Sequence, residues 1–165
     1  MLVARVSKTA LVAAIALYVT LVAVGNVVDY GTNYAFVQHV LMMDTIFQTS
    51  QIAGRSINVP LVHRIAYGLI IALEWAVAII CWVGAVVMAL RLRRPAVVFQ
   101  RAKAWAIAGL TLGVILWAVG FLAIGGEWFG MWMSSVWNGV QPAFRIALLI
   151  LAVLIYVSLP EPEIG

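Results

Sequence analysis

Glu74 is the residue whose type and position point most directly to chemistry, because it lies in the middle of the chain's longest apolar run, residues 65–90. A carboxylate at the centre of a bilayer costs about 3 kcal/mol on insertion scales, so such a residue usually has a buried partner or lines a functional cavity. His63, Tyr67 and Ile70 precede it at helical spacing and share its helix face. This face therefore has polar ends and runs from the membrane surface to mid-membrane.

Two interpretations of this face stay open. The functional one is a proton or quinone site, because His and Glu both titrate and Tyr can donate a hydrogen bond. The structural one is an interhelical network in which Glu74 is protonated or pairs with Arg145, although Arg145 could instead extend outward into water. We assign the predicted intramembrane polar network to His63, Tyr67, Glu74 and Arg145.

Other chemistry has little support in the sequence. Haem held by two imidazoles would need both histidines, His39 and His63. Met42 and Met43, beside His39, suggest copper or haem, but methionines in an apolar amphipathic segment usually serve packing. Zinc is excluded by the number of ligands, and no common catalytic or nucleotide-binding motif is present. We predict no catalytic residues, metal or cofactor, and keep quinone or haem as alternatives.

Composition defines the class of protein. Of 165 residues, 65% are hydrophobic and 10% charged, and the mean hydropathy is +1.10. Soluble domains carry about 25% charged residues, so a water-soluble fold is excluded. The net charge of +4 comes from basic clusters between apolar runs, a pattern that sets membrane orientation rather than binding nucleic acid. The lone Cys81 cannot form an internal disulfide and is predicted to be a small packing residue.

Four apolar segments are each near the roughly 20 residues that cross a bilayer. The N-terminus resembles a signal peptide, but its apolar run is too long and no cleavage-like site follows, so we interpret it as a retained helix. Pro60 suits the first turn of the second span, and Pro160 ends the fourth. We predict an all-α, single-domain, four-helix membrane bundle over residues 1–165, with spans at about 9–28, 63–90, 104–124 and 143–159.

The distribution of Lys and Arg predicts the orientation. Seven of these residues fall on one side of the predicted spans and three on the other. The positive-inside pattern then places both termini in the cytoplasm. The larger group comprises Arg5, Lys8, Arg91, Arg93, Arg94, Arg101 and Lys103, and the smaller one Arg55, Arg64 and Arg145. We expect Arg91, Arg93, Arg94, Arg101 and Lys103 to contact lipid headgroups.

The exported segments, 29–62 and 125–142, are rich in apolar residues. Apolar side chains recur at helical spacing within residues 33–47, which predicts a short helix along the membrane surface or the top of the bundle. The second segment carries aromatic residues of the kind enriched at membrane interfaces. Simple interfacial anchoring and a docking surface for a partner or ligand both fit this aromatic cap, which consists of Trp128, Phe129, Trp132 and Trp137.

The third span has a face of small residues that predicts close helix packing. Gly109 and Gly113 form a true G-x-x-x-G motif on this face, which also includes Ala106, Trp117 and Gly120. The contact is expected within the chain, with an intermolecular contact as the alternative. No internal repeat of the inverted kind common in secondary transporters is evident.

Three stretches resemble one bacterial family, known only as predicted small integral membrane proteins containing a domain of unknown function. They are DYGTNYAFVQHVLMMD at 29–44, ALEWAVAIICWVGA at 72–85 and AIGGEWFGMWMSSVWNG at 123–139, the last followed by Phe144-Arg145. The resemblance covers nearly the whole chain and implies four spans and a bacterial inner membrane. It implies no reaction or ligand. It suggests that the family pattern includes Asp44, Glu74, Glu127, Trp128, Trp137, Asn138 and Arg145.

Three functional hypotheses follow. The leading one is a non-catalytic accessory or structural subunit, packed in the bilayer against other membrane-protein subunits of a larger, energy-converting complex, respiratory or photosynthetic. The first alternative is a small transporter or proton-coupled channel centred on Glu74. The second is a quinone- or haem-binding redox subunit that uses His63 and Tyr67.

Overall fold

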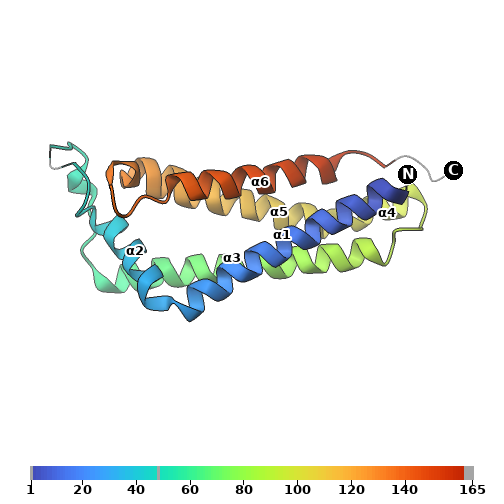
Figure 1. The fold of residues 1–165 in the computed structure, drawn as a ribbon, viewed down its shortest axis with the longest axis horizontal. Helices are drawn as coiled ribbons and strands as arrows, with labels where there is room; N and C mark the ends of the chain where they lie inside the picture. The colour runs from blue at the N-terminus through green and yellow to red at the C-terminus, as the bar shows by residue number, and fades with distance from the viewer. Residues whose placement is uncertain (1, 48, 162–165) are drawn as a thin grey trace.

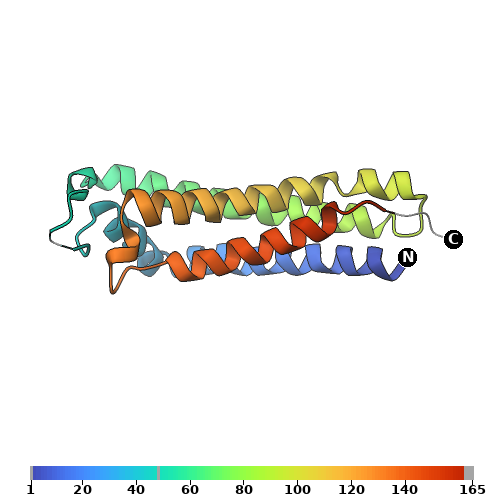
Figure 2. The ribbon, with the colours of Figure 1, turned by 90° about the horizontal axis from the view of Figure 1, so that it is seen from above.

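The structure is a computed structural model that describes residues 2–47 and 49–161. Four long rods lie side by side in an elongated bundle (Figures 1 and 2). The first three rods are α1 (Leu2–Val28), α3 (Pro60–Ala89), and the nearly continuous series α4 (Ala96–Ala102), α5 (Ala104–Ile115) and η2 (Leu116–Trp128). The fourth rod is α6 (Val140–Ser158). Each rod is long and apolar enough to cross a membrane, which confirms the predicted all-α membrane bundle.

The helices extend beyond several predicted span boundaries. The first begins at Leu2 instead of residue 9, because Arg5 and Lys8 become buried among polar partners. The third rod begins at Ala96 instead of residue 104, since α4 buries Ala96, Phe99 and Ala102 against the bundle. Hydropathy alone marks the apolar centre of such helices and misses ends that are polar in sequence yet packed in the fold.

The two ends of the bundle differ. The start of α1, the end of α6 and the loop between α3 and α4 gather at one end, called the terminal end below (Figures 1 and 2). The opposite end, called the cap end, carries α2 (Tyr30–Met42) and the short helices η1 (Ala53–Arg55) and η3 (Met131–Met133). Helix α2 corresponds to the short helix expected within residues 33–47 but begins three residues earlier, at Tyr30, and Met43 ends it in the left-handed conformation at φ 54°.

Small residues bring the helix backbones together between α3 and α5. A Cβ added to Gly84 would lie 2.5 Å from the backbone nitrogen of Ala106, and one added to Gly109 would lie 2.7 Å from the Cys81 sulfur. At Gly113 the nearest neighbour would be Ile150 of α6, at 3.2 Å. The small-residue face thus packs within the chain, and Cys81 is buried in that contact. Gly120 differs, because an added Cβ there would meet only Leu116 of its own rod, at 3.7 Å.

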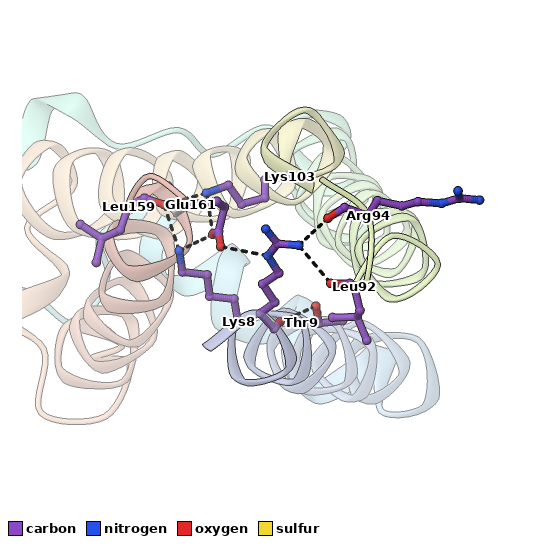
Figure 3. Close-up of polar contacts among 8 residues, drawn as sticks. Lys8, Thr9, Leu92, Arg94, Lys103, Leu159 and Glu161 are labelled. Atoms are coloured by element: carbon purple, nitrogen blue, oxygen red, sulfur yellow. Dashed lines mark hydrogen bonds and ion pairs between the residues drawn. The ribbon is translucent and has the colours of Figure 1, made fainter. Parts of the chain in front are cut away.

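A cluster of charges closes the terminal end. Glu161, which follows α6, receives hydrogen bonds from Lys8 of α1 at 2.5 Å and from Lys103 at 3.1 Å (Figure 3). Both lysines also donate to the backbone oxygen of Leu159, at 2.9 and 2.7 Å. The Arg5 guanidinium lies 3.6 Å from Glu161. We call Arg5, Lys8, Lys103 and Glu161 the terminal clasp.

The clasp buries its charges almost completely, with side chains that are at most 4% exposed. Arg5 also donates to the backbone oxygens of Leu92 and Arg94, at 3.1 and 2.6 Å, which ties α1 to the loop after α3. Burial alone would raise the pKa of the Glu161 carboxyl, but hydrogen bonds and charges from Lys8 and Lys103 outweigh this and hold the pKa below its usual value. Glu161 is therefore a carboxylate that compensates part of the buried positive charge.

The glycine contacts give a matched pair of variants within α3. Gly84→Ala forces a methyl group into the backbone of α5 and should lower the free energy of unfolding by about 1–3 kcal/mol. Gly68→Ala meets no atom within 4 Å and should be neutral or stabilising by up to about 1 kcal/mol, as expected for Gly→Ala in a helix. A thiol-reactive dye that labels the buried Cys81 on unfolding measures both. Equal stability of the two variants would show that α3 and α5 do not approach as described.

The clasp predicts that acid loosens the terminal end. The folded-state pKa of Glu161 lies below its ordinary 4.5. Its stabilisation is therefore complete above pH 4.5 and is lost as the pH falls through the lowered value. Thermal unfolding followed by tryptophan fluorescence between pH 7 and pH 3 should show wild type approaching the stability of Glu161→Gln. A constant difference between the two proteins across this range would contradict the prediction.

Candidate functional site

Glu74 is buried on α3, with 1% of its surface exposed, and its partner is an amide. The side-chain nitrogen of Asn26, near the end of α1, donates to Glu74 Oε2 at 2.7 Å. Asn26 was not among the residues predicted for this network from the sequence. The available signal was an amide near the end of the first apolar run, although a single asparagine in such a place is also common at a membrane surface.

Tyr67 adds a second hydrogen bond between α3 and the end of α1. Its hydroxyl donates to the backbone oxygen of Asn26 at 2.8 Å, and the side chain is 1% exposed. Two tyrosines of α2 pack around its ring, with centroid distances of 4.9 Å for Tyr30 and 6.1 Å for Tyr34. Asn26, Tyr67 and Glu74 thus join the end of α1 and the start of α2 to the half of α3 nearer the cap end.

His63 belongs to a different contact. Its Nε2 lies 2.7 Å from the backbone oxygen of Ile57, and because a carbonyl only accepts, Nε2 is the donor. The other ring nitrogen, Nδ1, is buried and has no hydrogen-bond partner in the part of the chain that the structure describes. His63 therefore fixes the segment that leads into α3, and its described hydrogen bond goes to the backbone rather than to Glu74.

Arg145 also departs from the predicted network. It is exposed on α6 and borders a groove with Tyr18, Pro142 and Leu149. Within the described residues, no hydrogen bond or ion pair joins Arg145 to Glu74. Pairing with Arg145 was one of the alternatives left open for Glu74, and the structure has the Asn26 contact in its place, since α6 turns Arg145 outward while α1 brings an amide to Glu74.

A cavity of about 310 Å³ adjoins the Glu74 carboxyl. Asn33 of α2 and Asn138, just before α6, add polar groups to its wall. Aromatic rings supply much of the remainder, from α2, α3 and η2. These rings belong to Phe36, Tyr67, Trp117 and Phe121. The cavity can therefore offer a carboxyl group, amides and aromatic rings to one molecule.

A second cavity, of about 340 Å³, lies between α2, α3 and η2 and is almost entirely apolar. Its walls include Leu69, Leu73 and Val119. It adjoins the first cavity, because four residues line both: Phe36, Val37, Ile70 and Phe121. The pair forms a region that is polar on the Glu74 side and apolar on the other.

The third rod changes its hydrogen bonding where it lines these cavities. From Leu116 to Trp128 it is a π-helix, a form whose characteristic hydrogen bonds join residues five apart, and the N–H of Phe129 closes it with a bond to the oxygen of Ile124. π-Helical segments are rare in proteins, and those that occur often lie at functional sites. Leu116 and Trp117 begin this stretch and line the apolar and polar cavities respectively. The apolar run predicted an ordinary helix here, and nothing in the sequence signals the change in hydrogen bonding.

The aromatic cap is a set of separate contacts at the cap end. Phe129 is buried, whereas Trp128 is 55% and Trp132 48% exposed. Arg55 lies over the Trp128 ring at 4.4 Å, and the Trp132 ring meets Phe47 at 5.9 Å. Trp137 stacks on His39 at 4.6 Å, while His39 also lies 2.6 Å from Asp44.

At the terminal end, the residues expected at lipid headgroups divide into two groups. Lys103 is 0% exposed and belongs to the terminal clasp. Its expected headgroup contact is therefore absent in this conformation. The exposed group consists of Arg91, Arg93, Arg94 and Arg101.

Among the described residues, no group of three His, Cys, Asp or Glu side chains is placed to hold a metal ion. The two histidines are engaged in separate contacts, His39 with Trp137 and Asp44 and His63 with Ile57. What the arrangement offers is recognition, with Glu74 as a hydrogen-bond acceptor, an ion-pair partner or a proton carrier.

Four apolar spans around a polar interior define a small integral membrane protein. The match to a family model makes the assignment specific. Residues 4–160 match the model described as "Predicted small integral membrane protein (DUF2165)", and the chain belongs to that family. Comparisons with curated proteins and with solved structures each found no match.

The Asn26 contact predicts which variants disturb Glu74. Asn26→Ala leaves the buried carboxyl without its donor and should lower the free energy of unfolding by about 1–3 kcal/mol. Arg145→Gln changes an exposed side chain and should alter it by less than about 0.5 kcal/mol. Unfolding in mixed micelles, followed by labelling of Cys81, tests both. If Arg145→Gln lowered the free energy of unfolding more than Asn26→Ala did, the result would contradict this prediction and favour an ion pair between Glu74 and Arg145.

Proposed function

We propose that this protein is a non-catalytic binding protein for an amphiphilic, membrane-soluble molecule whose polar head meets Glu74. The observation that carries the proposal is the pair of adjoining cavities, one with the Glu74 carboxyl and one almost entirely apolar. The first suits a small polar head and the second suits an aliphatic or ring-shaped body. Ligand sites commonly combine such apolar walls with a few placed polar groups.

The chemistry of the polar cavity favours a head that donates hydrogen bonds. Asn26 uses Glu74 Oε2, which leaves Oε1 available to a ligand. Asn33 and Asn138 provide further amide groups in the wall. An ammonium fits best, because a carboxylate can pair with it and aromatic rings such as those of Trp117 and Phe121, which line the cavity, attract cations.

A second candidate is the accessory subunit of a larger, energy-converting complex. The exposed rings of Trp128 and Trp132 at the cap end favour it, since large aromatics are enriched in protein interfaces. The two proposals are compatible, because a subunit can hold a ligand for its complex. Both place the protein in a bacterial inner membrane with cytoplasmic termini, an orientation that we infer from the distribution of Lys and Arg.

The transport and redox alternatives have less support. On the terminal side of Glu74 the bundle is filled by one cluster of buried apolar residues, which includes Val19, Cys81 and Ile150. A path for a proton or a transported molecule from Glu74 to the terminal end would require this cluster to open. The redox alternative needs His63 and Tyr67 to act together. It has less support because the two side chains form hydrogen bonds to different segments.

Ligand binding tests the leading proposal. Octylamine, octanoate and decyl-ubiquinone are added to the protein in micelles, and stabilisation is followed through Cys81, because a ligand of the folded state raises the unfolding midpoint. We expect octylamine to bind wild type and Glu74→Gln to weaken this binding about tenfold or more, as expected for loss of a charged partner. Arg145→Gln, which changes a charge outside both cavities, serves as the control.

Two results would contradict this proposal. Octanoate could stabilise the protein as well as octylamine does, or Glu74→Gln could leave octylamine binding unchanged. Binding of decyl-ubiquinone that survives Glu74→Gln would move the site to the apolar cavity and revive the redox alternative. The subunit role is tested separately by gentle extraction from native membranes and a native gel, where migration near 17.9 kDa plus bound detergent would oppose it.

A further inference from the structure

The apolar cavity beside the Glu74 site opens on the side of the bundle. Large apolar side chains of α3 and of the third rod form part of its wall and are themselves about half exposed. They are Leu69, Ile115, Val119 and Ile124, with exposed fractions between 48% and 57%. Both rods are long and apolar enough to cross a membrane, so the surface between them faces lipid. The cavity is therefore in contact with the hydrocarbon of the bilayer.

Toward the cap end, packed side chains bound the same cavity. Met43, Ile46 and Phe129 form a cluster of buried apolar residues there, and Val40 and Leu41 of α2 pack against it. Phe129, Val40 and Leu41 also line the cavity. An apolar chain in the cavity would therefore meet packed side chains toward the cap end and lipid on the open side.

Gly120 of η2 leaves space where it lines this cavity. An added Cβ there would meet only Leu116 of its own rod, at 3.7 Å, which is an ordinary contact distance. Gly113 on the same rod differs, because an added Cβ would lie 3.2 Å from Ile150 of α6. The missing side chain at Gly120 thus serves no close contact between helices, and its effect is to widen the cavity.

Given the binding function proposed above, on which this inference depends, we propose that the ligand of the Glu74 site is a lipophilic amine with one alkyl chain. The chain runs past Gly120 and leaves the bundle between α3 and the third rod. The ammonium head pairs with the Glu74 carboxyl, and the four residues that line both cavities connect the head site to the chain site. Because the chain site is open to lipid, a chain longer than the cavity continues into the bilayer.

A series of chain lengths tests the open end of the cavity. Octylamine and hexadecylamine are titrated into wild type in micelles, and affinity comes from the rise in the unfolding midpoint, measured through Cys81. Affinities are expressed per mole of detergent, because these amines partition into the micelle. Hexadecylamine should bind within about threefold of octylamine, since the additional methylenes lie in an apolar environment whether the amine is bound or free. A larger fall in affinity would show a cavity that is closed to long chains and would overturn the proposal.

A matched pair of glycine variants tests the chain site. Gly120→Leu fills the space beside the chain and should weaken hexadecylamine binding by about tenfold or more, because overfilling an apolar site is costly. Butylamine carries the same head on a short chain and should bind Gly120→Leu as it binds wild type. Gly68→Leu makes the same change at an exposed position on α3 that lines neither cavity and has no atom within 4 Å of an added Cβ. It should leave the affinity for both amines unchanged.

The outcomes separate the chain site from the binding function itself. If hexadecylamine loses affinity in Glu74→Gln but not in Gly120→Leu, the binding function holds and the chain site is wrong. Equal losses in Gly120→Leu and Gly68→Leu would also overturn the chain site, because only one of the two glycines lines the cavity. If no amine stabilises wild type, the binding function fails and the chain site fails with it. Gly120→Ala, with a smaller loss of hexadecylamine affinity expected, takes the place of Gly120→Leu if the larger side chain prevents folding.

Discussion

A bilayer interior offers no water, so every buried polar group of this protein must find its partner within the chain or in a bound molecule. This constraint explains the contacts that join the helices at both ends. Near the cap end, Asn26 donates to Glu74 and Tyr67 donates back to the Asn26 backbone. At the terminal end, Glu161 and backbone oxygens satisfy three buried cations. Between these two polar layers the packing depends on small residues and apolar side chains.

The two halves of the bundle therefore differ in the space that they leave for a ligand. In the half toward the terminal end, one cluster of buried apolar residues fills the centre of the bundle, and Gly84 and Gly109 allow α3 and α5 to approach closely. The half toward the cap end contains the two adjoining cavities, where α2 and a π-helical segment replace regular helix packing. A protein built only to fill space in a complex would not need a carboxyl group beside such a cavity. For this reason the ligand-binding proposal stands ahead of the purely structural one.

Several features could be predicted from sequence because each depends on local composition. Apolar runs predicted the four spans, and the small-residue spacing at Ala106, Gly109 and Gly113 predicted a packing face. Predictions about partners were less successful. Arg145 was expected beside Glu74 because both lie toward the same side, yet α6 turns it outward. Lys103 was expected at the lipid surface, yet the segment after α6 covers it. Helix rotation and the path of an irregular segment decide such contacts, and neither leaves a periodic signal.

The sequence by itself determined that this chain is an all-α membrane protein and that Glu74 requires a special environment, because the cost of placing charge in a bilayer is a property of each residue and its neighbours in the chain. Only the tertiary structure decided what that environment is. Asn26 is 48 positions from Glu74, and Lys8 is 153 from Glu161. Hydrogen bonds act over about 3 Å, so these pairs exist only once the helices are packed in one particular rotation and order.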